Sequence, residues 1–407
     1  MRRLLAILIL SFLSYSCSPS SSSKNPYEIV LWEMEDAQVA PYIDETLTNF
    51  CDYYLKKYSI KPSISRTHYQ GEDLRQQFQA ASLAGVPPDI LISPSDTAGL
   101  YAISGFIKNL EKEIDFSIYN KPVIEAVALE DKIWGVPISN GNHLMLFYNK
   151  KFAPNAPQNT QELFDFCAKN KGKFDYCLAF DMGEPFWLMP WLGAYGGWPL
   201  KDRTPTLNTE AMIKTLKFYL SLKYDKKISP PECDYNCMDS LFKEEKTPFI
   251  INGDWALSSY SSALKDKFGV ALIPKLSETG LWPSPMISGK YFLVSSSVSP
   301  EKMKVIKELM LFYTNKENQI KQYKVLKRLP SLKEASFAKE IVSDPLSAAS
   351  MAQILKGKPM PMAVEMRAVW DTARNYQGLA TTRKMTPEEA AEKMQKNVEK
   401  KIEEMNR

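Results

Sequence analysis

Short apolar runs alternate with amphipathic segments in the N-terminal part of the chain. The runs at 28–32 and 90–92 predict strands, and so does the segment 63–69. Between these strands, residues 40–58 and 71–83 carry apolar side chains at helical spacing. Strands that alternate with helices predict a mostly parallel sheet with helices on both faces, which is an α/β fold.

A second α/β pattern follows two extended segments, 132–138 and 144–148, which have almost no connection between them and are suited to carry the chain from one lobe to another. Periodicity predicts further helices at 160–169, 210–222, 300–314 and 386–405. Apolar runs predict further strands at 176–180, 247–252, 269–273 and 290–295. Thr386 and Glu389 predict a capping box at the start of the last helix, with Pro387 at its first position.

The N-terminus predicts export. A basic start and a short apolar run are typical of a secretory signal peptide over residues 1–16. The run is shorter than the roughly 20 apolar residues that a bilayer crossing needs. Cys17 follows directly and resembles a bacterial lipoprotein cleavage site, although Leu13 lies one place further from it than in the usual pattern. The alternative is ordinary cleavage nearby with Cys17 free. Residues 17–26 predict a Ser-rich polar tether behind the lipidated cysteine.

Composition excludes several classes of protein. The chain has 407 residues, 44% apolar and 24% charged, which fits a globular protein of two lobes and excludes disordered, collagen-like and polytopic membrane chains. Lys and Arg total 51 against 47 Asp and Glu, a net charge of only +4. A nearly neutral chain argues against nucleic acid as the main partner.

Five cysteines lie beyond the leader, and an exported chain can keep disulfides. Proximity in sequence favours the pairs Cys167–Cys177 and Cys233–Cys237, with Cys51 a buried free thiol. Connectivity does not follow from sequence alone, so other pairings stay open.

No motif points to catalysis. The chain contains no Gly-x-Ser-x-Gly elbow, His-Glu-x-x-His, Gly-x-Gly-x-x-Gly or phosphate loop. His68 and His143 lie beside no nucleophile with a carboxylate, and both are far in sequence from the cysteines. We therefore expect no catalytic residue, no metal site and no cofactor. A pair of glycosidase carboxylates stays open, because their spacing is spatial.

Carboxylates and aromatic residues follow four of the predicted strands. They include Asp36, Asp96, Glu184 with Phe186, and Trp255. In open parallel sheets, ligands bind beyond the carboxyl ends of strands. Two of these clusters fall in each half of the chain, so facing lobes would bring them together.

Such residues suit a sugar. A pyranose offers apolar C–H faces to aromatic rings and a rim of hydroxyls to carboxylates. Trp255, Phe186 and Trp370 are candidate faces, and Asp36, Asp96 and Glu184 are candidate acceptors. Each also has a structural interpretation: core packing for the aromatic residues, capping for Glu184 and Asp96, and solvation for Asp36.

Seven segments occur in a known order over about residues 27–390. They are 29–32, 84–90, 99–105, 134–138 leading to 147–150, 184–186 through 195–197, 251–255 and 386–390. In this order they resemble the family 1 bacterial extracellular solute-binding proteins, and most closely the maltose/maltodextrin-binding branch.

The resemblance implies a two-lobe, type II periplasmic-binding-protein-like fold. Each lobe would be a mostly parallel sheet flanked by helices, with three hinge crossings and a ligand cleft between the lobes. We expect residues 27–139 plus 287–329 in lobe I, and 140–286 plus 330–407 in lobe II. The resemblance also implies no enzymatic activity and delivery of ligand to the permease subunits of an ABC importer.

The resemblance also assigns site residues. The positions that match the sugar contacts of that branch are Asp36, Asp96, Glu184, Phe186, Trp255 and Trp370. Four positions depart from it. Ala37 replaces a basic residue, Thr97 an arginine, Asn142 a glutamate and Phe186 a tyrosine. These departures make a different sugar or another small ligand possible.

The sequence thus predicts an exported lipoprotein of the bacterial periplasm or cell surface, palmitoylated at Cys17 and monomeric. It would bind a mono- to oligosaccharide, resembling a maltodextrin, between its lobes. The alternatives are the same fold binding a non-sugar solute such as a polyamine, a glycosidase-type enzyme, and a purely structural surface lipoprotein.

Overall fold

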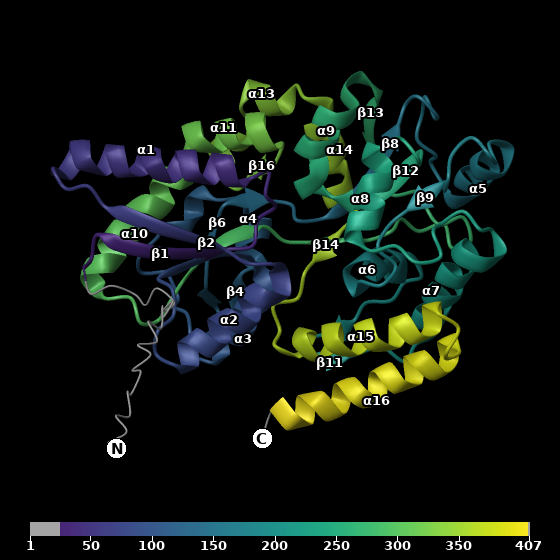
Figure 1. Ribbon diagram of the computed structural model, residues 1–407. Coiled ribbons are helices and arrows are strands. Elements are labelled where there is room, and N and C mark those ends of the chain that lie inside the picture. Colours follow the sequence, from purple (N-terminus) through teal and green to yellow (C-terminus); the bar gives the residue numbers. More distant parts are fainter. Residues whose placement is uncertain (1–24, 406–407) are drawn as a thin grey trace, which may run out of the picture.

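Two sheets, each with its own covering helices, form two lobes (Figure 1). The computed structural model describes residues 25–405. The predicted signal peptide, Cys17 and the tether up to residue 24 lie outside the described residues. Within residues 25–405, none of the helices combines the length and the apolar content needed to cross a bilayer.

The first lobe is built on a five-stranded sheet in the order β2-β1-β3-β15-β6. Its strands are β1 (Glu28–Glu33), β2 (Ser63–His68), β3 (Ile90–Pro94), β6 (Val136–Pro137) and β15 (Lys290–Val294). Strands β2, β1 and β3 are parallel, and β15 runs antiparallel to both β3 and β6. The parallel part confirms the strand–helix alternation expected for residues 28–92.

Helices cover both faces of this sheet. Ile29 and Leu31 of β1 belong to a core shared with α1 (Ala40–Tyr58) and α10 (Pro300–Tyr313). Val30 and Trp32 point to the opposite core, which holds α2 (Gly71–Leu83) and α3 (Ala98–Ile103). Because successive side chains of a strand point to opposite faces, one apolar run supplies both cores.

The second lobe contains a four-stranded sheet in the order β13-β8-β12-β9. Its strands are β8 (Leu144–Asn149), β9 (Leu178–Ala179), β12 (Phe249–Gly253) and β13 (Phe268–Ala271). The mostly parallel sheet expected here is wrong for this lobe, since β8 pairs antiparallel with both β12 and β13 and only β9 is parallel to β12. Gly253 pairs with Leu144, so β12 ends where β8 begins. Strand β8 leads away from the first lobe and β12 leads back towards it, so the two neighbouring strands run in opposite directions.

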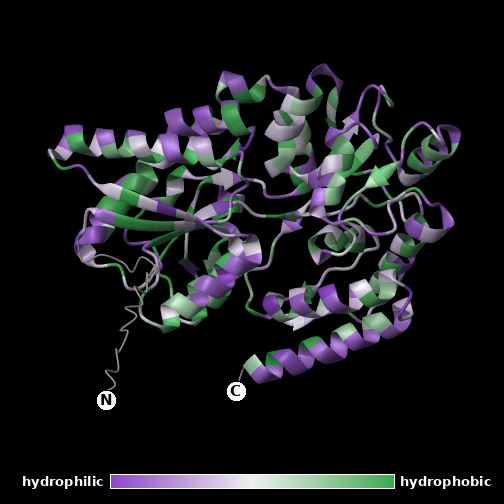
Figure 2. Cartoon of the chain, viewed as in Figure 1, coloured by the Kyte–Doolittle hydropathy of each residue, from purple (hydrophilic) through white to green (hydrophobic). Residues whose placement is uncertain are grey.

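The main helices of the second lobe are α5 (Thr160–Lys169), α6 (Pro185–Ala194), α7 (Glu210–Leu220), α8 (Tyr235–Lys243), α9 (Leu257–Leu264), α14 (Pro345–Ile354), α15 (Glu365–Thr381) and α16 (Pro387–Met405). Helices α15 and α16 run side by side at the lower edge of this lobe and bury their apolar sides in its core (Figure 1). The backbone N–H of Thr386 donates to Glu389, and the N–H of Glu389 donates to the Thr386 hydroxyl. This pair confirms the predicted capping box. The rest of α16 exposes mostly hydrophilic residues (Figure 2).

Short elements complete the chain. Helix α11 (Lys316–Leu326) follows α10 along the chain. The short helices are η1 (Ser95–Thr97), η2 (Phe116–Ile118), α4 (Lys121–Glu125), η3 (Ser221–Asp225), η4 (Asp254–Ala256), η5 (Lys265–Lys267), α12 (Lys333–Ser336) and α13 (Lys339–Val342). The short strands are β4 (Ala128–Leu129), β5 (Lys132–Ile133), β7 (Ser139–Asn140), β10 (Leu200–Lys201), β11 (Thr204–Pro205), β14 (Met286–Ile287), β16 (Leu329–Pro330) and β17 (Lys358–Pro359).

Paired segments connect the lobes. Strand β7 pairs with β16, β14 pairs with β17, and Gly141 bridges to Ser288. The residues at which the two lobes divide stay a prediction. Helices of the two lobes also meet directly, because Arg367 of α15 donates to Glu72 of α2 at 3.0 and 3.1 Å.

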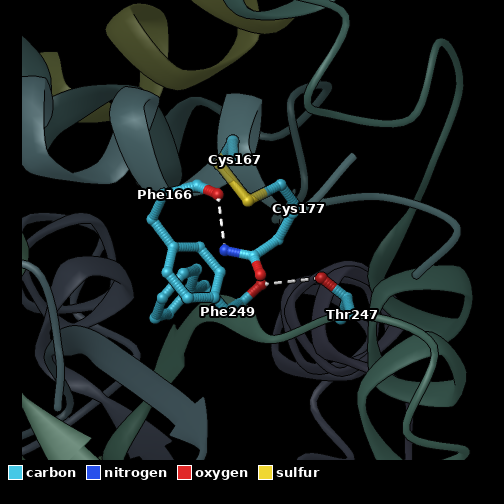
Figure 3. The surroundings of a disulfide bond; sticks show 6 residues. Phe166, Cys167, Cys177, Thr247 and Phe249 are labelled. Atoms are coloured by element: carbon cyan, nitrogen blue, oxygen red, sulfur yellow. Dashed lines mark hydrogen bonds between the residues drawn. A yellow bond between two sulfur atoms is a disulfide. The ribbon is translucent and has the colours of Figure 1, made fainter. Parts of the chain in front are cut away.

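Two disulfides lie in the second lobe, in the pairing that proximity in sequence favours. Cys167 of α5 is joined to Cys177, just before β9 (Figure 3), and Cys233 is joined to Cys237 of α8. Cys51 is a buried free thiol. Beside the Cys167–Cys177 disulfide, Phe166 of α5 packs against Phe249 of β12 with ring centroids 5.1 Å apart. The disulfide and this ring contact together hold α5 against the sheet.

Candidate functional site

Two carboxylates of the first lobe lie at the ends of neighbouring parallel strands. Asp36 follows β1, and Asp96 lies in η1, directly after β3. Burial raises the pKa of both carboxyls, and the positive charge of Lys290 opposes this rise in each case. Oδ1 of Asp96 is buried without a hydrogen-bond partner among the described residues. A buried carboxylate oxygen without a donor is unfavourable, so this oxygen is suited to accept from a ligand.

Three aromatic rings of the second lobe gather around Phe186. The ring centroid of Phe186, at the start of α6, lies 6.2 Å from that of Trp255 and 6.4 Å from that of Trp370. Trp255 belongs to η4, directly after β12, and Trp370 belongs to α15. Nε1 of Trp370 is also buried without an acceptor among the described residues. These rings offer apolar faces and one unused N–H donor.

Local packing explains the position of Trp255. Its ring lies over Gly253, where any Cβ would collide with it, so the glycine that ends β12 makes room for the indole. Trp187 packs against Trp255 at 6.2 Å between ring centroids and donates from Nε1 to the backbone oxygen of Ile251 at 2.8 Å. Trp187 is therefore a buried support for the half-buried ring of Trp255.

Tyr235 of α8 contacts Trp255 and lies near the charge of Asp36 in the first lobe. Nε1 of Trp255 donates to its hydroxyl at 3.1 Å. Burial, with the negative charge of Asp36 as the next contribution, raises the pKa of Tyr235 to about 12. Helix α15, which carries Trp370, lies beside η1, which carries Asp96. We call these six residues the interlobe cluster: Asp36, Asp96, Phe186, Tyr235, Trp255 and Trp370.

Two of the predicted site residues contact partners outside this cluster. The Glu184 carboxylate forms an ion pair with Arg374 of α15 at 2.9 Å, so the side chain already has a partner. Asn142 lies where the chain crosses between the lobes, with a positive φ of 46°. Its N–H donates to the Asp254 carboxylate at 3.2 Å. No hydrogen bond or ring contact within residues 25–405 joins Asn142 to the interlobe cluster.

Tyr235, Lys290 and Arg328 were not predicted from the sequence. Tyr235 lies between Cys233 and Cys237, and this closed loop was a signal that fixes its position. Lys290 begins an otherwise apolar strand, where a lysine is unusual. Arg328 had no comparable signal, because its importance comes from a partner almost 300 residues away.

That partner is Glu35, which is buried beside Asp36. Nη2 of Arg328 donates to Oε2 of Glu35 at 2.5 Å, and Nζ of Lys290 lies 3.8 Å from Oε1. Burial would raise the pKa of Glu35, but the charges of Arg328 and Lys290 hold it at about 2. The first lobe therefore presents two buried cations next to its candidate carboxylates.

Known proteins with similar sequences bind oligosaccharides, as their names state. The galactooligosaccharide-binding protein of Bacillus subtilis is 28% identical over 394 residues, which cover 92% of this chain and 89% of that protein. The maltotriose-binding protein of Pyrococcus abyssi is 27% identical over 355 residues, covering 84% of this chain and 75% of that protein.

Solved structures agree with this similarity. A maltose/maltodextrin-binding domain from Bdellovibrio bacteriovorus bound to maltotriose superposes with a TM-score of 0.85 and 32% identity, over 92% of this chain and all of that domain. A Thermus thermophilus maltotriose-binding protein has a TM-score of 0.82 at 22% identity, a likeness that shows the fold alone. The model of the bacterial extracellular solute-binding protein family matches residues 50–349, and the chain belongs to this family.

Proposed function

We propose that this protein binds an oligosaccharide between its lobes and delivers it to the permease of an ABC importer, without catalysing a reaction. The single observation that carries the proposal is the interlobe cluster. Three rings of the second lobe and two partly buried carboxylates of the first form this cluster, and both Asp96 Oδ1 and Trp370 Nε1 lack a partner among the described residues. A sugar stacked on the rings would accept from the indole and donate to the carboxylate.

The relatives support this ligand class. Those with similar sequences are named for binding galactooligosaccharide and maltotriose, and the domain that is 32% identical was solved with maltotriose. The relatives do not indicate whether maltotriose or a galactooligosaccharide is the better ligand. Asp36, Asp96, Phe186, Trp255 and Trp370 are the proposed contacts, and Tyr235 joins them.

Delivery requires that the closed form be the one that binds ligand best. A ligand that bridges both lobes shifts a hinge equilibrium only by the difference between its affinities for the two forms. We infer that the ordered contacts between the lobes belong to the form that the permease receives.

We also propose that the mature chain is anchored to a membrane through a lipid on Cys17. Relatives from Streptococcus pneumoniae, 24% identical over 388 and 384 residues, are named as solute-binding lipoproteins. Mass spectrometry of the N-terminal peptide tests this anchor: a diacylated Cys17 in the wild type and a soluble Cys17→Ser variant are expected. An unmodified Cys17, or cleavage beyond it, would contradict the anchor and leave the binding proposal intact.

A ligand panel tests the binding proposal. Melting temperature is measured with maltotriose, a galactooligosaccharide, glucose and spermidine, followed by calorimetry of each positive compound. Because a ligand stabilises the state that binds it, at least one oligosaccharide should raise the melting temperature by several degrees at saturation.

Each other result decides between the alternatives. A shift with spermidine alone favours a polyamine-binding protein of the same fold. Release of nitrophenol from chromogenic glycosides would show an enzyme. No shift with any compound, together with an unchanged radius of gyration, would contradict a solute-binding role for these sugars.

A further inference from the structure

Lys290 is a buried residue whose ammonium forms no hydrogen bond with a carboxylate among the described residues. Its side chain is 11% exposed, at the start of β15, where the strand pairs with Pro94 at the end of β3. No hydrogen bond leads from its ammonium to any described residue. The closest carboxylate oxygen, Oε1 of Glu35, lies 3.8 Å away, beyond hydrogen-bond distance. The ammonium is therefore mostly buried but has no strong acceptor among the described residues.

Glu35 does not require this lysine as its hydrogen-bond partner. Its Oε2 already accepts from Arg328 at 2.5 Å, and these two side chains form a buried ion pair. Oε1 of Glu35 itself lacks a hydrogen-bond partner among the described residues. A lysine that served only to neutralise Glu35 would be expected to close this gap, because a buried pair is favourable only with good hydrogen-bond geometry.

Instead, the ammonium lies among all three acids at this end of the sheet. Its charge acts on Glu35, on Asp36 and on Asp96. Asp36 faces Tyr235 of the other lobe, and Asp96 lies in η1 beside α15. Lys290, paired with Pro94 next to η1 and 3.8 Å from Glu35, therefore lies on the first-lobe side of the interlobe cluster.

We propose that Lys290 is a specificity-determining residue, which donates from its ammonium to hydroxyl oxygens of the bound oligosaccharide and makes the site selective for neutral polyols over cations. This inference rests on the proposed function. A hydroxyl can accept from Lys290 and donate to Asp36 or Asp96 at the same time, which satisfies groups that the protein leaves unpaired. A polyamine can only donate, and it would meet a fixed positive charge among the acids.

The test compares Lys290→Met, which keeps the length of the side chain but removes the charge, with Lys290→Gln, which keeps a donor. Lys108→Met is the matched control, since Lys108 belongs to the same lobe and donates to the backbone oxygen of Val298, away from the cluster. Calorimetry measures the affinity of each variant for maltotriose, the galactooligosaccharide and spermidine, and thermal melting measures its stability without ligand.

For the oligosaccharide that the wild type binds, Lys290→Met should lose affinity by about 10- to 100-fold, the range for a hydrogen bond to a charged group. Lys290→Gln should lose less, and Lys108→Met should bind like the wild type. Affinity for spermidine should rise in Lys290→Met, because the remaining charges are acidic. Melting of ligand-free Lys290→Met should stay within a few degrees of the wild type.

Other outcomes separate this inference from the proposed function. Wild-type protein that binds no oligosaccharide would overturn the proposed function and the role of Lys290 with it. Wild-type protein that binds sugar while Lys290→Met binds equally well would overturn only the role of Lys290. If both Lys290 variants unfold, Lys290 is a structural partner of Glu35 and the inference is wrong.

Discussion

Single side chains in the interlobe cluster combine an unpaired polar atom with a fixed apolar surface. Trp370 and Asp96 each carry a buried polar atom that no described residue satisfies, whereas the N–H of Trp255 is already bound to Tyr235. Trp255 should therefore act through its ring, and Trp370 through its ring and its N–H. The sites of a functional protein are where such unsatisfied groups are expected.

Replacing Trp255 by alanine should weaken oligosaccharide binding by about 1–3 kcal/mol, because a large aromatic contact would be lost. Trp282→Ala is the control, since that ring packs with Lys356 away from the cluster. Calorimetry with the sugar identified in the panel measures both variants. Equal affinities for the Trp255 variant and the wild type would remove Trp255 from the site.

Replacing Asp96 by asparagine should have opposite effects on the stability of the protein and on its affinity for sugar. Burial raises the pKa of its carboxyl, so the folded protein holds this proton more tightly than the unfolded chain does. Stability is then lost as pH rises from the ordinary to the raised value. Asp96→Asn should make the ligand-free protein more stable by about 1 kcal/mol at neutral pH. It should bind sugar about tenfold less tightly, because a charged acceptor is lost.

Melting curves between pH 3.5 and 7.5 check the first part, and calorimetry at pH 7 checks the second. Asp52→Asn is a control of opposite sign, since a hydrogen bond from Lys61 lowers the pKa of Asp52 and its stabilising effect is present above the ordinary value. If Asp96→Asn melts below the wild type at neutral pH, the carboxylate has a structural partner and this interpretation is wrong.

The sequence predicted these side chains unevenly. Asp36, Asp96, Phe186 and Trp255 were predictable because each follows a strand, and Trp370 because of the resemblance to the family; the structure brings their elements together. Glu184 was selected on the same grounds, yet it pairs with Arg374, 190 residues further along the chain. Lys290 and Arg328 were missed for the same physical reason: their surroundings are set by contacts between distant segments.

At the scale of elements, local patterns predicted the helices best. The bounds of α1, α2 and α5 match the expected ranges, because each has apolar positions at helical spacing and a clear end. The segment at 132–138 was expected to be continuous, but it forms only β5 and β6, since Trp134 and Gly135 lie between two separate pairings. The direction of β8 was not predictable, because pairing direction depends on the path of the chain between the lobes.

The two disulfides predict a separation of binding from stability. Cys233–Cys237 closes the first turn of α8, which positions Tyr235, whereas Cys167–Cys177 anchors α5 to the sheet. Replacing Cys233 and Cys237 by serines should cost about 2 kcal/mol of stability. Replacing Cys167 and Cys177 should cost about 3 kcal/mol, because that disulfide closes the longer loop.

Only the Cys233→Ser, Cys237→Ser protein should lose affinity, by a few-fold, since Tyr235 would be held less firmly beneath Trp255. Denaturant unfolding and calorimetry on both double variants measure the two effects. A loss of affinity in the Cys167→Ser, Cys177→Ser protein alone would contradict the role assigned to Tyr235.

At the scale of the molecule, the two lobes also touch outside the paired segments that connect them. Arg367 reaches Glu72 across the lobes, and Met362 lies so close to Gly99 of α3 that any Cβ at Gly99 would collide with its backbone. The Ser258 hydroxyl of α9 donates to the backbone oxygen of Val325 in α11 at 2.8 Å. These contacts are those of a closed arrangement, in which binding and domain closure would be coupled.

The ion pair between Glu72 and Arg367 provides the last prediction. Burial opposes ionisation of Glu72, but Arg75 and Arg367 hold its pKa at about 2. The stabilising effect of this charge should therefore be fully present above the ordinary pKa of 4.5 and be lost as pH falls towards 2. Both side chains are partly exposed, so Glu72→Gln should weaken ligand binding by only about 0.2–1 kcal/mol, and the difference should shrink at high salt.

Glu308→Gln, which breaks a pair with Lys57 within the first lobe, should leave affinity unchanged. Calorimetry at about 50 and 500 mM salt, where the Debye length is about 14 and 4 Å, measures the effect. Small-angle scattering should show that the Glu72 variant needs more ligand to reach the compact form. If its affinity equals that of the wild type at low salt, this pair is an incidental contact and closure depends on the ligand alone.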